Sequence, residues 1–206
     1  MSEWVAYRIA AWDTPFWSLP NRREGRFNHA GKSATQYLSL HPLTPWAEIA
    51  RNERRVERAE LEELRLPVWA ARLVLDKEPA EVGFDEAAEW GLEPEDLIAD
   101  DRAACQALGE RFRQDPDLPD ALVVPSAALP GTRNLIVFGP RVISSYLLDP
   151  IDFQDAPASL VSERSMIPAG MEALIRHFDA PHRAFEAWRD GSDFVFEEPP
   201  ADHLAD

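Results

Sequence analysis

Glycine, cysteine and basic residues are scarce in this chain of 206 residues, and each shortage excludes a class of protein. The nine glycines include no Gly-x-Gly triplet, which excludes the dinucleotide-binding turn of a Rossmann fold. The single cysteine, Cys105, can form neither an internal disulfide nor a cysteine metal cluster, as is typical of a reducing compartment. No apolar run approaches the roughly 18 residues of a membrane span, and residues 1–4 do not begin a signal peptide. We therefore expect a cytoplasmic protein with no membrane contact.

Motifs of several common enzyme classes are also missing. There is no Gly-x-Ser-x-Gly elbow of the kind that hydrolases carry. Gly31-Lys32-Ser33 resembles the end of a P-loop, but five residues separate it from Gly25 where the motif needs four. The five histidines show no His-x-x-x-His spacing, so we expect no metal site.

The charge is acidic overall but unevenly distributed. Asp and Glu number 37 against 21 Lys and Arg, a net charge of −16, which argues against direct nucleic-acid binding. Residues 1–56, however, hold eight basic and five acidic residues, a net charge of +3. This local excess indicates a positively charged site for a small anion. Three of its arginines, Arg51, Arg54 and Arg55, are expected to form only a solvated helix face.

Hydrophobic periodicity predicts a mixed α/β (α+β) fold. Short runs rich in aromatic and β-branched residues predict strands at residues 4–10, 36–40, 67–75, 122–126 and 134–138. Helices are expected at residues 45–58, 85–90, 100–113 and 167–189. The last two predicted strands are close enough to be neighbours. The composition shifts after Pro150, so we expect one domain over 1–150 and, over 151–206, a mostly helical C-terminal extension with an acidic tail.

Several polar residues lie within or beside these apolar segments and form the candidate site. In chain order they are Arg8, Arg26, Asn28, Tyr37, Glu48, Ser126 and Asn134.

Each of these residues also has an ordinary structural interpretation. An arginine in an apolar strand must find a partner, so Arg8 pairs with a carboxylate of either the protein or a ligand. Arg26 follows a glycine, and its planar guanidinium suits either a phosphate or a hydrogen bond that fixes the loop. Taken alone, Tyr37 suits the core, Glu48 a solvated helix and Ser126 a turn.

The order of these residues resembles the RES domain family, which is named for an Arg, a Glu and a Ser. The resemblance covers about residues 4–148. Its motifs are Tyr7-Arg8, Gly25-Arg26-Phe27-Asn28 with Gly31, Tyr37-Leu38-Ser39-Leu40, Glu48, Val124-Pro125-Ser126 and Asn134-Leu135-Ile136-Val137-Phe138. Family members often carry Trp where this chain has Phe27.

The resemblance implies a toxin enzyme with an ADP-ribosyltransferase-like fold, central β-sheets flanked by helices. Its substrate would be NAD⁺, with no prosthetic group, and it would cleave the nicotinamide–ribose bond. The ADP-ribosyl group would pass to water (NAD⁺ glycohydrolase), to phosphate (NAD⁺ phosphorylase) or to a protein. The alternative, from another class of function, is a RES module that binds NAD⁺ or a partner protein without enzymatic activity.

The resemblance also suggests roles for the candidate residues. Glu48 would stabilise the positive charge that develops on the ribose. Arg8 and Arg26 would hold the phosphates, and Tyr37 would stack on the nicotinamide or hydrogen-bond near the ribose. Ser126 would anchor the ribose or the nicotinamide amide. Asn28 and Asn134 complete the expected NAD⁺-binding set.

RES toxins are commonly paired with an antitoxin that has a helix-turn-helix part and a segment that blocks the active site. We therefore expect such a partner, to which any DNA contact would mainly belong. The acceptor, the oligomeric state and the role of residues 151–206 stay open at this point.

Overall fold

The computed structural model describes residues 1–9, 20–32, 34–52, 66, 68–139, 148–150 and 170–199. Its strands are β1 (Ser2–Ile9), β2 (Thr35–Ser39), β3 (Val68–Leu75), β4 (Ala80–Glu81), β5 (Ala121–Pro125), β6 (Arg133–Phe138) and β7 (Leu148–Pro150). Its α-helices are α1 (Thr44–Asn52), α3 (Ala103–Gln114) and α5 (Arg183–Arg189). Short 3₁₀ helices lie at η1 (Ala87–Trp90), η2 (Pro94–Leu97) and η4 (Met171–Ala173).

The strands form one sheet in the order β4-β5-β6-β2-β1-β3-β7. All neighbours are antiparallel except β4 and β5. The long pairings join β1 with β3 and β2 with β6, whereas β1 and β2 are registered at one pair, Tyr7 with Ser39. Thus the centre of the sheet is weakly joined, and the side chains of the candidate site surround this junction.

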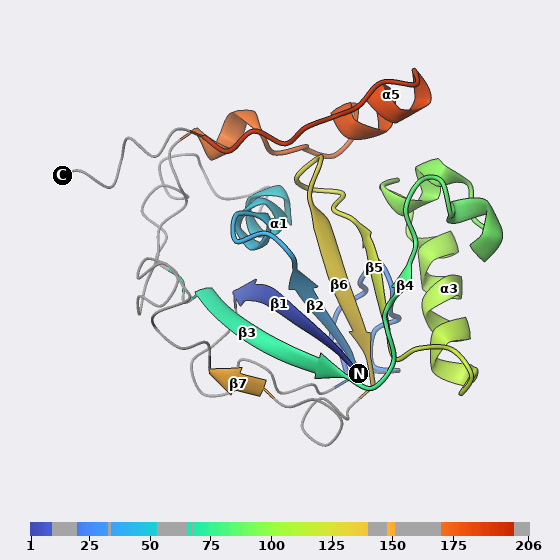
Figure 1. Ribbon diagram of the computed structural model, residues 1–206. Helices are drawn as coiled ribbons and strands as arrows, with labels where there is room; N and C mark the ends of the chain where they lie inside the picture. The colour runs from blue at the N-terminus through green and yellow to red at the C-terminus, as the bar shows by residue number, and fades with distance from the viewer. Residues whose placement is uncertain are drawn as a thin grey trace.

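Alternating side chains divide the core between the two faces of the sheet, as the period of two in a β-strand requires. Leu122, Val124 and Ile136 pack in the cluster that contains Leu108 and Phe112 of α3. Their neighbours Val123, Leu135 and Val137 point to the other face and pack with Leu38 and Leu73. Figure 1 shows α3 (green) beside the β4–β6 half of the sheet.

A third cluster joins the C-terminal segment to α1. Trp46 and Ala50 of α1 pack with Met171 and Ile175, which come from the far end of the chain. Figure 1 shows this segment (orange to red) passing over the end of the sheet near α1 and β6. Residues 170–182 are therefore packed against the helix that carries Glu48.

Most elements lie where the sequence places them, and the predicted mixed α/β class is confirmed. The predicted strands correspond to β1, β2, β3, β5 and β6, and β5 and β6 are neighbours as expected. In the C-terminal segment the helical span expected over 167–189 is interrupted: only 171–173 and 183–189 are helical among residues 170–199. The part of the 45–58 helix beyond Asn52, with Arg54 and Arg55, lies outside the described residues.

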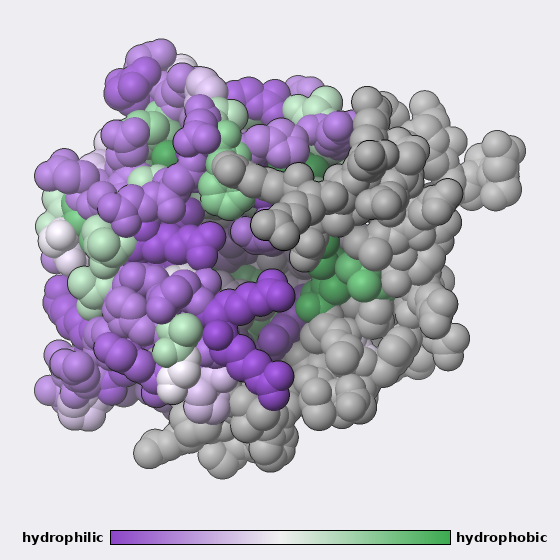
Figure 2. All heavy atoms as spheres, turned by 180° about the vertical axis from the view of Figure 1, so that it is seen from behind, coloured by the Kyte–Doolittle hydropathy of each residue, from purple (hydrophilic) through white to green (hydrophobic). Residues whose placement is uncertain are grey.

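On the face that Figure 2 shows, the surface of the described residues is mainly polar. Figure 2 shows hydrophilic side chains over most of the described atoms on the face opposite to that of Figure 1, with small apolar areas between them. The exposed large hydrophobic side chains among the described residues are Met1, Val5 and Val195. No helix in the described part of the chain is long and apolar enough to cross a membrane.

Candidate active site

A cavity of about 540 Å³ lies where β1, β2 and α1 meet the loop that contains Arg26. This volume is within the usual range for a small-molecule site. Five of the seven candidate residues line it: Arg8, Arg26, Tyr37, Glu48 and Asn134. Of the other two, Ser126 bonds to Glu48 and Asn28 bonds to Tyr37. The fold therefore gathers into one place residues that are up to 126 positions apart, from Arg8 to Asn134.

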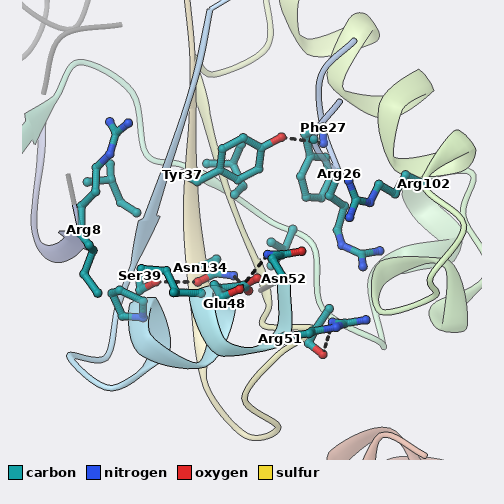
Figure 3. Close-up of a pocket in the computed structure, with 18 of the residues that line it drawn as sticks. Arg8, Arg26, Phe27, Tyr37, Ser39, Glu48, Arg51, Asn52, Arg102 and Asn134 are labelled. Atoms are coloured by element: carbon teal, nitrogen blue, oxygen red, sulfur yellow. Dashed lines mark hydrogen bonds between the residues drawn. The ribbon is translucent and has the colours of Figure 1, made fainter. Parts of the chain in front are cut away.

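The carboxylate of Glu48 lies in the cavity wall and is held by two donors, of which Figure 3 shows Asn134. The Ser126 hydroxyl (3.3 Å) and the Asn134 amide (3.2 Å) both donate to its Oε1. Among the described residues no donor bonds to Oε2. One oxygen of the carboxylate is thus held in place, and the other is bonded to no donor in the described part of the chain.

Both donors are themselves fixed. Ser39 donates its hydroxyl proton to Oδ1 of Asn134 at 3.0 Å. The buried Ser126 Oγ accepts the backbone N–H groups of Ala128 (3.2 Å) and Leu129 (3.1 Å). Serine at 126 is thus both the turn former that its position after Pro125 suggests and a support for Glu48.

Arg8 lines the cavity and has one unsatisfied guanidinium nitrogen. Its Nη1 is buried and has no hydrogen-bond partner among the described residues. Burial lowers the pKa of the guanidinium from its ordinary value, although an arginine stays protonated at neutral pH. No carboxylate in the described part of the chain forms an ion pair with it, so both partners that the sequence allows for Arg8, a carboxylate of the protein or of a ligand, stay open.

A second group of arginines lies on the other side of Glu48. Figure 3 shows Arg8 at one side of the pocket and Arg26, Arg51 and Arg102 at the other. Arg26 donates to the carbonyl of Asp96 at 3.5 Å, and Arg102 donates to the carbonyl of Glu24 at 3.0 Å. Both guanidinium groups therefore keep donors for an anion.

The expectation that Arg51 belongs to a solvated helix face is wrong. Its side chain is only 3% exposed and forms an ion pair with Asp100 and a hydrogen bond to the carbonyl of Ala127. Burial is the main reason why the pKa of Arg51 falls to about 10. The helical period puts Arg51 next to Glu48. The carboxylate partner of Arg51 is Asp100, which lies 49 residues away in sequence and cannot be predicted from a local pattern.

Tyr37 and Asn28 hold the turn that carries Arg26. The Tyr37 hydroxyl donates to Oδ1 of Asn28 (2.8 Å) and accepts the N–H of Phe27 (2.9 Å). Burial raises the pKa of Tyr37 to about 12, so the phenol stays neutral. A Cβ on Gly25 would lie 2.2 Å from Asn28 Oδ1 and 2.3 Å from the Tyr37 oxygen, so the turn closes only with glycine there. Hence the Tyr37 hydroxyl is engaged in the turn, while Tyr37 still lines the cavity.

One face of α3 supports the same turn from behind. Gln106 donates to the carbonyls of Gly25 (3.1 Å) and Asn28 (3.3 Å), and Arg113 donates to the carbonyl of Phe27. Gly109, between them, lets the helix approach, because a Cβ there would lie 2.3 Å from the Phe27 oxygen. The spacing 106, 109 and 113 is helical, but nothing in the local sequence shows which loop this face meets.

Residues that the sequence did not single out complete the wall. Ser39, Arg102 and Phe178 line the cavity, and Phe178 comes from the C-terminal segment. Among the described residues no group of three His, Cys, Asp or Glu side chains is placed to hold a metal ion.

Fold and site together define an α/β protein with a fixed carboxylate in an arginine-lined cavity, suited to a small anionic molecule. The model of the RES domain family matches residues 5–155. The chain therefore belongs to the RES domain family, as the order of its motifs predicts.

The chain is similar to proteins of known name or known structure. A probable NAD(+) phosphorylase of Mycobacterium tuberculosis is 30% identical over 130 residues, which cover 58% of this chain and 55% of that protein. The chain thus spans about half the length of this relative. The crystal structure of the M. tuberculosis MbcT–MbcA toxin–antitoxin complex contains a chain of similar fold, with a TM-score of 0.54 and 22% identity. That match covers 72% of this chain and 82% of the other.

Proposed function

We propose that this protein is a toxin enzyme that binds NAD⁺ and cleaves the bond between nicotinamide and ribose. The observation that carries the proposal is the Glu48 carboxylate, held through one oxygen by Ser126 and Asn134 in a cavity that Arg8 also lines, with its buried Nη1 bonded to no described residue. Membership of the RES domain family and the similarity to a probable NAD(+) phosphorylase support the choice of substrate.

The arrangement suits the charges of NAD⁺ and of its cleavage. Breaking the C1′–N bond sends the bonding electron pair to the nicotinamide, which leaves as a neutral molecule, and a positive charge develops on the ribose. Glu48 would stabilise this charge, as carboxylates do in glycoside hydrolysis. Its fixed position would avoid reorganisation as the charge forms. Arg8 on one side, or Arg26 with Arg102 on the other, would hold the pyrophosphate.

The remaining candidate residues would act mainly by holding these groups. Ser126 and Asn134 would orient Glu48, and Asn28 would keep the turn of Arg26 closed. Tyr37 would offer its ring to the substrate, since its hydroxyl already has two partners.

An acceptor oxygen completes the reaction by forming a new bond to C1′. Water would lose a proton and yield ADP-ribose, whereas inorganic phosphate would yield ADP-ribose 1″-phosphate. The name of the M. tuberculosis relative favours phosphate. Attachment of ADP-ribose to a protein would instead make the chain a protein ADP-ribosyltransferase.

The direct test is nicotinamide release from NAD⁺ by the purified protein, with and without phosphate, and with product identification by mass. We expect Glu48→Gln to lower the rate at least about 100-fold, the usual effect of losing a group that stabilises transition-state charge. Glu81→Gln is the matched control, because that carboxylate is 51% exposed and outside the cavity. Undiminished release by Glu48→Gln would remove Glu48 from the mechanism. NAD⁺ binding without release by the wild type would favour a binding module.

We also propose an antitoxin partner with a helix-turn-helix part and a segment that covers the cavity. The structural neighbour comes from a toxin–antitoxin complex, and the net charge of −16 leaves any DNA contact to the partner. The test is co-expression of this chain with a helix-turn-helix protein encoded by an adjacent gene. The expected result is a stable complex that does not release nicotinamide from NAD⁺.

A further inference from the structure

The C-terminal segment beyond the family match is bonded to the backbone around the site. The N–H of Arg176 donates to the carbonyl of Ala128 at 2.8 Å. The buried His182 contacts the carbonyl of Ser126 through Nε2 at 3.0 Å, and its Nδ1 accepts the N–H of Phe185 at 3.1 Å. Because Ser126 bonds to Glu48, residues 176–182 lie directly behind the group at the centre of the site.

A single carboxylate then links this segment to α1. Asp100 Oδ1 forms ion pairs with Arg51 and with Arg176, at 3.6 Å to the latter. Its Oδ2 accepts the N–H of Asp179 at 2.7 Å. Asp179 has φ of 62°, the left-handed region, alone among the described non-glycine residues. Such a conformation is unfavourable for a side chain and persists only where the surroundings impose it.

The residue that this strained turn presents to the cavity is Phe178. It lines the cavity wall, and the guanidinium carbon of Arg51 lies 4.5 Å from the centre of its ring. An aromatic ring backed by a buried arginine is a flat apolar surface, which suits stacking with another ring. Polar and charged side chains share the rest of the wall with apolar ones, among them Phe27 and Tyr37.

We propose that Phe178 is a specificity-determining residue whose ring contacts an aromatic heterocycle of the substrate, and that the C-terminal segment contributes to the wall of the active site through this residue. This inference rests on the proposed function, since NAD⁺ carries two such heterocycles, adenine and nicotinamide. It gives the C-terminal segment a role in substrate binding that the family match over residues 5–155 does not include.

The test measures NAD⁺ binding by calorimetry in a Glu48→Gln background, in which turnover is expected to be slow. Phe178→Ala is expected to weaken binding roughly tenfold, the usual loss for one base stacked on an aromatic side chain. Phe178→Trp is expected to keep the affinity, and Phe178→Leu, which keeps an apolar side chain, is expected to lose it. The matched control is Phe185→Ala, since Phe185 packs on Phe84 and Trp188 and does not line the cavity.

Two shorter ligands identify the heterocycle. If Phe178→Ala weakens ADP-ribose and not nicotinamide mononucleotide, the ring stacks on adenine; the reverse result assigns nicotinamide. If Phe178→Ala and Phe178→Leu are both folded, as judged by circular dichroism, and bind NAD⁺ as tightly as the parent, this inference is overturned while the proposed function still stands. Absence of NAD⁺ binding in the wild type as well would overturn the proposed function together with it.

Discussion

Replacing Asp100 by Asn should destabilise the protein strongly, although this carboxylate does not itself line the cavity. The substitution leaves the guanidinium groups of Arg51 and Arg176, which are 3% and 8% exposed, without their common counter-charge. Removing one partner of a buried ion pair typically costs about 3–5 kcal/mol. Because Asp100 is itself 27% exposed and Asn keeps one acceptor oxygen, we expect the lower end, about 3 kcal/mol.

The assay is urea unfolding followed by circular dichroism at neutral pH. Glu81→Gln makes the same change of charge in an exposed pair with Arg133, where the side chains are 51% and 55% exposed, and should cost less than about 1 kcal/mol. Equal midpoints for Asp100→Asn and Glu81→Gln would refute the argument that Asp100 neutralises two buried arginines.

The same variant has a defined pH dependence. Burial acts to raise the pKa of Asp100, but the N–H of Asp179 and the charges of Arg51 and Arg176 outweigh it and hold the pKa below its ordinary value. A depressed carboxyl pKa contributes stability that is fully present above the unfolded pKa of about 3.9 and is lost as the pH falls through the folded value. The difference between wild type and Asp100→Asn should therefore shrink below about pH 4, and a constant difference down to pH 2 would contradict this cause.

Two further substitutions test the surroundings of the site. Gly25→Ala places a Cβ within 2.3 Å of the oxygens of Asn28 and Tyr37, so the turn must open; we expect a loss of about 2–4 kcal/mol in unfolding free energy and weaker NAD⁺ binding. Wild-type behaviour of this variant in both measurements would show that the turn can close without glycine. Burial is the main reason why the pKa of His182 is lowered to about 4. Between about pH 6.5 and 4 the unfolded chain binds a proton at His182 that the folded protein does not, so the free energy of unfolding should fall by about 3 kcal/mol over this range. His182→Gln should flatten this part of the pH profile, and an unchanged slope would assign the titration to another group.

The sequence pattern was a good guide wherever the cause of a structure is local. The strands around Tyr7, Tyr37 and Asn134 follow from runs of β-branched and aromatic residues, and α1 from the spacing of Trp46 and Ala50. The order of the candidate residues likewise led to the RES domain family, which the family match confirms.

The pattern failed where two distant segments decide the environment of one side chain. Arg51 looks like a solvated arginine on its own helix, and its burial comes from Asp100 and Phe178, both far along the chain. Gln106 and Arg113 look like ordinary polar residues of an amphipathic helix, yet they hold the backbone of the turn that carries Arg26.

Local chemistry along the chain was thus enough to establish the elements, the basic N-terminal region and the set of residues that could act on an anion. Only the tertiary structure decided which groups hold those residues in place. Glu48 accepts a hydrogen bond from Ser126, 78 residues away, and the Tyr37 hydroxyl accepts the N–H of Phe27 in the turn that carries Arg26. The physical reason is that hydrogen bonds and ion pairs act over a few ångströms in space, without regard to separation in sequence. The C-terminal segment shows this most clearly, because its sequence carries no motif, and only the fold places it behind Ser126 and beside Arg51.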